Sequence, residues 1–80
     1  MHYVYLMENT TEPRKRYTGY SDDLEQRIRD HNSGKNVSTT PHRPWHLKTY
    51  LAFGTKGQAL AFELYMKSGS GRAFSNKHLW

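Results

Sequence analysis

The sequence contains no cysteine and no long apolar segment. Without cysteine the protein has no disulfide, no thiolate zinc site and no cysteine nucleophile, which fits a reducing compartment. No apolar run approaches the roughly 20 residues that span a bilayer, and Met1-His2-Tyr3 does not open a signal peptide. We therefore expect a cytoplasmic protein.

Acidic residues are almost absent from the second part of the chain, where Glu63 is the only one between His31 and Trp80. The whole sequence has 12 Lys and Arg against 7 Asp and Glu, a formal charge of +5, so a polyanion is the expected partner. An isolated carboxylate in so basic a region suggests a function. The cations that surround it in the sequence are Lys35, Arg43, Lys48, Lys56, Lys67, Arg72 and Lys77.

The length of 80 residues predicts a single domain over 1–80, in which only about 60% of the unfolded chain's surface is buried. A shallow surface site is therefore expected. The hydrophobic pattern, caps and turn residues predict an α/β chain of strands and helices. The expected strands cover 3–7, 16–20 and about 45–53, and the expected helices cover about 22–33 and 55–67, followed by a glycine-rich bend at 68–72 and a short last helix over 73–80.

The first expected helix has two unlike faces. At about 100° per residue, Leu24, Arg27, Ile28 and His31 share one arc. The pattern thus predicts that Arg27 points inward and Arg29 outward.

The second expected helix is apolar nearly all round from Ala59 to Met66, so it is expected to be the most buried one. Glu63 lies between Ala59 and Phe62 on its surface, and its carboxylate must be desolvated or face a special partner. Between the two helices, the polar segment 35–43 is too long for a simple turn and is a candidate binding loop.

A polyanion partner raises the question of phosphodiester cleavage. That reaction needs a cation on the nonbridging oxygens, an activated water and stabilisation of the leaving oxygen. Arg27, Glu63 with a bound divalent ion, and phenolic tyrosines can fill these roles.

Each of these residues also has a purely structural interpretation. The tyrosines can simply pack on a small sheet, since strands favour tyrosine. Arg27 can pair with Asp23 four residues earlier, and Glu63 with Lys67 four residues later. His31 on the inward face is by default a hydrogen-bonded structural histidine.

Taken together, the residues resemble the GIY-YIG nuclease domain over essentially all 80 positions. Tyr3-Val4-Tyr5 stands where the first triplet is expected and Tyr17-Thr18-Gly19 matches the second. Tyr3 replaces a glycine and Thr18 an isoleucine, as in the small stand-alone bacterial members. Arg27 and His31 stand at family positions.

Glu63 matches the family's metal-binding glutamate, and Asn76 matches an asparagine near the domain's end. The resemblance implies a small three-stranded antiparallel sheet flanked by helices and hydrolysis of DNA phosphodiesters with one Mg²⁺ or Mn²⁺ on Glu63. Arg27 would bind the scissile phosphate. Tyr5 or Tyr17, its hydroxyl acidified by nearby cations, would activate water or contact the phosphate, with His31 sharing the proton transfer.

The same resemblance implies DNA as the partner, and branched or damaged DNA in repair or processing is one substrate class that it allows. Eighty residues leave no room for a separate DNA-binding domain, so affinity and specificity are expected either to be low or to be supplied by a protein partner or a homodimer. The alternative functions are a noncatalytic basic nucleic-acid binding module with a structural Glu63, and a basic RNA-binding protein. The cations are expected to contact the nucleic-acid backbone. The full set of expected nucleic-acid-binding residues is Lys35, Arg43, Lys48, Arg72, Asn76 and Lys77.

Overall fold

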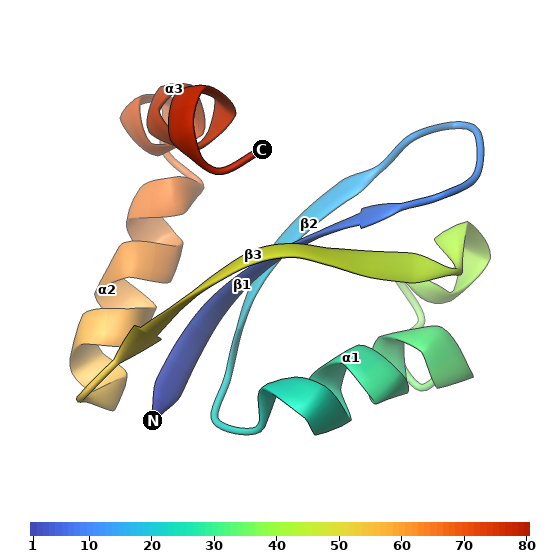
Figure 1. The fold of residues 1–80 in the computed structure, drawn as a ribbon, viewed down its shortest axis with the longest axis horizontal. Coiled ribbons are helices and arrows are strands. Elements are labelled where there is room, and N and C mark those ends of the chain that lie inside the picture. The colour runs from blue at the N-terminus through green and yellow to red at the C-terminus, as the bar shows by residue number, and fades with distance from the viewer.

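The computed structural model of the protein describes residues 1–80 and contains the expected three-stranded antiparallel sheet (Figure 1). The strands are β1 (His2–Asn9), β2 (Arg16–Ser21) and β3 (Trp45–Phe53), in the order β2-β1-β3. The central strand β1 contributes the buried run from Val4 to Met7, which is the middle of the core. The prediction of strands from the aromatic and β-branched runs is confirmed.

Strand register places the first candidate tyrosines on one face of the sheet. Tyr5 pairs with Gly19, and Met7 pairs with Tyr17 on β2 and with Leu47 on β3. Side chains alternate between faces along a strand, so Tyr5, Met7 and Tyr17 point to the same side. Trp45 completes the core cluster there.

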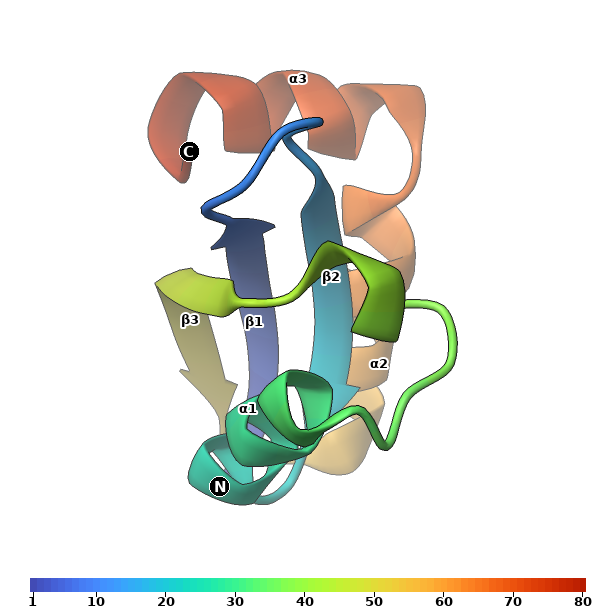
Figure 2. The same ribbon diagram turned by 90° about the vertical axis from the view of Figure 1, so that its right-hand side faces the viewer.

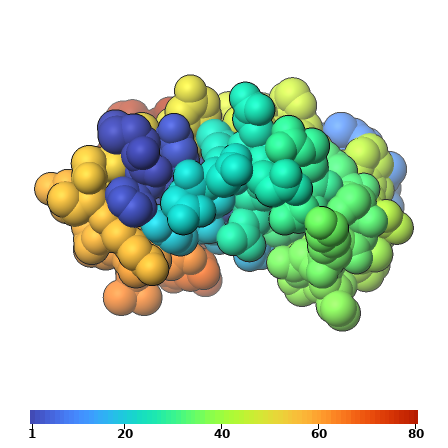
Figure 3. All heavy atoms as spheres, turned by 90° about the horizontal axis from the view of Figure 1, so that it is seen from below, coloured from blue at the N-terminus to red at the C-terminus, as the bar shows by residue number.

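Three helices surround the sheet. The sheet lies between α1 (Leu24–Ser33) and α2 (Lys56–Met66), and α3 (Gly69–His78) crosses one end of it (Figures 1 and 2). Helix α1 begins after Asp23, whose carboxylate accepts the Gln26 N–H, and ends at Gly34 with a left-handed φ of 89°. The space-filling view from below shows the amino-terminal residues of β1 between α2 and α1 (Figure 3). No helix of the protein is both long and apolar enough to cross a bilayer.

Helix α3 already begins at Gly69, so the predicted glycine-rich bend over 68–72 is confined to Lys67 and Ser68. Ser68 is the N-cap of α3, and its hydroxyl accepts the Gly71 N–H. A side chain at position 71 would collide with the Tyr65 carbonyl oxygen, so glycine lets α3 approach the end of α2. This close contact between helices outweighs the poor helix propensity of glycine.

Helix α2 is also less buried than its composition predicts. Only Ala59 and Met66 are buried, whereas Leu60 is 42% and Leu64 71% exposed. The domain has a single sheet layer, so α2 covers that sheet with one narrow stripe and its other side meets solvent. No helix is more buried than α2, since α3 also buries two residues and α1 buries only His31, but α2 is not buried all round as its apolar composition predicts.

Candidate active site

A buried chain of three side chains forms the centre of the candidate site. The Tyr5 hydroxyl lies 2.8 Å from His31 Nε2, and His31 Nδ1 lies 2.8 Å from the Thr39 hydroxyl oxygen. All three residues are about 1% exposed, and none of their side-chain polar atoms lacks a partner. The chain ties β1 to α1 and to the segment before the short 3₁₀ helix η1 (Thr40–His42). His31 is thus well satisfied, as its structural interpretation predicts.

Gly19 allows Tyr5 to reach this position. The phenol ring of Tyr5 crosses over β2, where a side chain at position 19 would lie 2.6 Å from the Tyr5 hydroxyl oxygen. The rings of Tyr5 and Tyr17 lie side by side with centroids 6.1 Å apart, and Tyr17 also meets the His31 ring edge-on at 5.1 Å. The two triplets of the sequence therefore meet at one point, on the β2 side of the sheet.

The environment of Tyr5 opposes ionisation. Burial raises the pKa of its hydroxyl well above the usual value of 10, and the neighbouring Tyr17 and Glu63 raise it further, while Arg27 lowers it. For Tyr5 the expectation of an acidified hydroxyl was wrong, because desolvation outweighs the nearby cation. Tyr5 therefore keeps its proton at neutral pH.

His31 is held in its neutral form. Burial lowers the pKa of its imidazole below the usual 6.5, and the positive charge of Arg27 lowers it further, against a smaller opposing effect of Asp30. A neutral imidazole keeps one ring nitrogen free to accept a proton.

Arg27 is exposed, although its charge acts on the buried Tyr5 and His31. It lies at the edge of the buried face of α1, where a long side chain can keep its charged end in water. It forms no ion pair, and Asp23 caps the helix instead of pairing with it. An unpaired guanidinium whose charge is felt by both Tyr5 and His31 is available to an anionic ligand.

Glu63 is half-buried on α2, and its charge also acts on Tyr5. Lys67 Nζ lies 3.0 Å from Glu63 Oε2, so the helical ion pair of the structural interpretation is formed. The other carboxylate oxygen accepts no hydrogen bond from the protein and is left for a further ligand.

No group of three or more His, Asp or Glu side chains surrounds a common point that could hold a metal. A dedicated protein cage is therefore absent, and Glu63 alone is the available anionic ligand near the tyrosines. A single carboxylate fits a hard, mostly hydrated cation such as Mg²⁺, which commonly binds through one or two carboxylates and the phosphates of its substrate.

The expected nucleic-acid-binding residues lie in three places. Lys35 pairs with Asp30 at 3.4 Å near the end of α1, and Arg43 Nε donates to the Thr40 carbonyl. Lys48 is exposed on β3. The remaining three are on α3: Arg72, Asn76 and Lys77.

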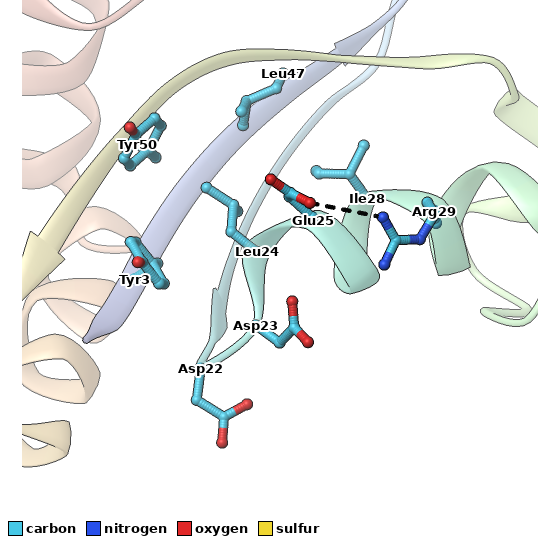
Figure 4. A pocket seen from close by; sticks show the side chains of 9 residues that line it. All are labelled: Tyr3, Asp22, Asp23, Leu24, Glu25, Ile28, Arg29, Leu47 and Tyr50. Atoms are coloured by element: carbon cyan, nitrogen blue, oxygen red, sulfur yellow. Dashed lines mark ion pairs between the residues drawn. The ribbon is translucent and has the colours of Figure 1, made fainter.

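The largest hollow of the protein lies elsewhere, between α1 and the strands β1 and β3, with a volume of about 670 Å³ (Figure 4). Its floor is apolar, with Leu24 and Ile28 among its residues, and its rim carries Asp22, Asp23 and Glu25. Such an acidic rim repels phosphate, and none of the candidate catalytic residues lines it. This hollow is therefore a poor place for phosphodiester cleavage.

Sequence patterns missed two residues of the site. Thr39 lies in a polar loop, where nothing in the sequence indicates that its hydroxyl reaches His31. Arg16 lies beside Tyr17 and donates to Asn76 Oδ1 at 3.2 Å, and its guanidinium lies 4.6 Å from the centroid of the Trp80 ring. The only sequence signal for Arg16 was its place directly before the second triplet.

The chain is similar to known proteins over most of its length. The family model described as the GIY-YIG catalytic domain matches residues 1–77. A UPF0213 protein of Haloquadratum walsbyi is 41% identical over 68 residues, covering 84% of this chain and 74% of the relative. A UPF0213 protein of Staphylococcus saprophyticus is 37% identical over 70 residues, covering 86% and 83%.

A solved structure supports the same assignment. The solution NMR structure of a UPF0213 protein from Bacillus halodurans superposes with a TM-score of 0.56 at 34% identity, covering 95% of this chain and 82% of that one. Fold, triplets and sequence similarity agree, and the chain belongs to the GIY-YIG catalytic domain family.

Proposed function

We propose that the protein is a divalent-metal-dependent endonuclease that hydrolyses DNA phosphodiester bonds, in repair or processing of branched or damaged DNA. The observation that carries this proposal is that Tyr5, Tyr17 and His31 meet at one point, with ring centroids 6.1 Å apart for the two tyrosines and a 2.8 Å contact between the Tyr5 hydroxyl and His31. Arg27 and Glu63, from two different helices, lie near enough for their charges to influence the pKa of Tyr5. Membership of a nuclease family supports the proposal.

Each residue has a role that follows from its surroundings. Glu63 would hold Mg²⁺ or Mn²⁺, which when bound supplies Lewis-acid stabilisation of the phosphate and a more acidic water. Arg27 binds the nonbridging oxygens of the scissile phosphate, because its guanidinium is unpaired and carries donors in a fork. Arg27 therefore neutralises charge that grows in the transition state.

The tyrosines and His31 form a path for the proton of the attacking water. Tyr17 is half-buried and closer to solvent than Tyr5, so its hydroxyl contacts the water. Tyr17 accepts a proton from the water and gives its own hydroxyl proton to the Tyr5 oxygen, and Tyr5 gives its own proton to Nε2 of neutral His31. Both phenols therefore stay protonated, and His31 becomes the imidazolium. Thr39 fixes the direction of this transfer, because its hydroxyl oxygen accepts a hydrogen bond from the Nδ1–H of His31. The hydroxyl's own proton can be donated to the Asn36 carbonyl oxygen, 3.4 Å away.

One observation favours the second candidate function, a noncatalytic nucleic-acid binding module. The ion pair between Glu63 and Lys67 gives the carboxylate a purely structural role. Nicking of plasmid, branched and single-stranded DNA, with Mg²⁺ or Mn²⁺ and with EDTA, separates the two functions. The nuclease proposal predicts metal-dependent cleavage by the wild type and none by Glu63→Ala, whereas the binding module predicts DNA binding without cleavage by either protein.

A further inference from the structure

A second hollow of about 380 Å³ lies beside Tyr17, between β2 and the helices α2 and α3. We call it the β2 groove, and its lining includes Arg16, Tyr17, Arg72 and Trp80. Ligand sites commonly have volumes of about 300–1,000 Å³, so this space is large enough for one nucleotide. Figure 2 shows β2 with α2 and α3 beside it.

The groove is basic without any acidic residue in its lining, which contains three cations. Arg16 and Lys67 are partly neutralised by ion pairs with Glu8 and Glu63. Arg72 is exposed on the first half of α3 and has no ion pair, so its full charge is available. The groove therefore favours an anion, and Arg72 is the cation most free to bind it.

Besides Arg72, the β2 groove contains a flat surface formed by the Trp80 ring and the Arg16 guanidinium, which we call the aromatic platform. The guanidinium of Arg16 lies 4.6 Å from the centroid of the Trp80 ring, and Arg16 is held in place by Glu8 and Asn76. Flat aromatic and guanidinium groups stack with nucleobases whatever the base. Asn76 uses its Oδ1 for Arg16, which leaves its amide N–H groups free to donate to a base or a phosphate.

We propose that the β2 groove binds one unpaired nucleotide next to the scissile phosphate, with the phosphate on Arg72 and the base on the platform of Trp80 and Arg16. This inference rests on the proposed function for its position, since Tyr17 lines both the groove and the candidate active site. A paired base must leave its stack to enter such a groove, and an unpaired base need not. The protein therefore prefers single strands, overhangs and frayed ends to blunt duplex.

DNA-binding affinities, measured under conditions that prevent cleavage, test this proposal. Fluorescence anisotropy with labelled oligo(dT), a duplex with an overhang and a blunt duplex, all in EDTA, should give the tighter affinities for the first two. Trp80→Leu should weaken oligo(dT) binding about tenfold, because one stacked base is lost, and should leave the blunt duplex unchanged. Trp80→Phe should keep most of the preference, since phenylalanine still stacks.

Arg72→Gln tests the phosphate contact. Arg72 lies in the first half of α3, so this test does not depend on how the residues around Trp80 fold. Removing one phosphate contact to a single strand should lower the slope of log affinity against log salt by about 0.7. Lys56→Gln is the matched control, because it removes the same charge from an exposed residue at the start of α2, outside the groove.

Three results would overturn the inference: equal affinity for oligo(dT) and blunt duplex, equal losses for both ligands in Trp80→Leu, or the same salt slope in Arg72→Gln as in Lys56→Gln. Thermal unfolding of each variant shows whether α3 is intact. These binding measurements need no metal, so they can support the β2 groove even if the protein does not cleave DNA. Conversely, the protein can cleave DNA even if the groove binds no nucleotide.

Discussion

Replacing Gly19 by alanine measures how tightly the two tyrosines are packed. The new methyl group would lie 2.6 Å from the hydroxyl oxygen of Tyr5, 2.7 Å from its Cζ and 2.8 Å from Cε1 of Tyr17. Tyr5 is buried and hydrogen-bonded to His31, so its ring has little freedom to move away. Overpacking of this kind costs about 1–3 kcal/mol in the free energy of unfolding.

For a domain of this size, that loss corresponds to a melting temperature lower by roughly 5–20 °C. Circular dichroism on heating measures it, and Gly54→Ala is the control, since nothing lies within 4 Å of a side chain at position 54. The displaced Tyr5 should also lose the hydrogen bond to His31, which the imidazole resonances in NMR report. A Gly19→Ala protein that melts with the control and keeps the wild-type His31 resonances would refute the packing argument.

Three further predictions concern Arg27, Thr39 and His31. Arg27→Ala should slow nicking about 10²–10³-fold, while its melting temperature stays near that of the wild type, because the side chain is exposed and unpaired; an active variant contradicts the phosphate role. Thr39→Val should leave a buried imidazole N–H without a partner and cost about 1–3 kcal/mol in urea unfolding; an unchanged midpoint contradicts this. Because the pKa of His31 is lowered in the fold, the unfolded chain binds more protons below about pH 6.5, and stability should decrease as the pH falls through this range. Urea unfolding at several pH values should show a weaker decrease in His31→Gln, and identical curves would contradict the depressed pKa.

The strands and the limits of α2 could be predicted because their signals are local. The run from Tyr3 to Met7 has the composition of a buried strand, and Thr55 caps α2 three residues before Gln58. The bend predicted at 68–72 is shorter than expected, because Gly71 lies inside α3 to allow a close contact with the Tyr65 carbonyl, which no local pattern reveals.

In the candidate site, too, features with a local sequence signal could be predicted, and contacts between distant residues could not. Helical spacing placed Arg27 and His31 on one face of α1, but it could not show that the arginine keeps its charged end in water while the histidine is buried. Thr39 could not be found, because its contact with His31 depends on how the loop folds back over α1. The raised pKa of Tyr5 depends on burial in three dimensions, which the sequence reports only indirectly.

The central claim is that Glu63 holds the metal ion of a nuclease, and Glu63→Gln tests it most directly. The amide keeps the shape of the side chain and removes the charge that binds a hard cation. Glu25→Gln is the matched control, because Glu25 forms an i,i+4 ion pair with Arg29, like that of Glu63 with Lys67, but lies on α1 at an exposed position.

Nicking rates with Mg²⁺ or Mn²⁺ and melting temperatures are measured on both variants and the wild type. The account predicts that Glu63→Gln folds and binds DNA but does not cleave it, while Glu25→Gln cleaves at the wild-type rate. If Glu63 serves only its ion pair, both substitutions should cost about 0.3–0.5 kcal/mol of stability and leave cleavage unaffected. A folded Glu63→Gln protein that nicks DNA as fast as the wild type would contradict the metal-nuclease mechanism.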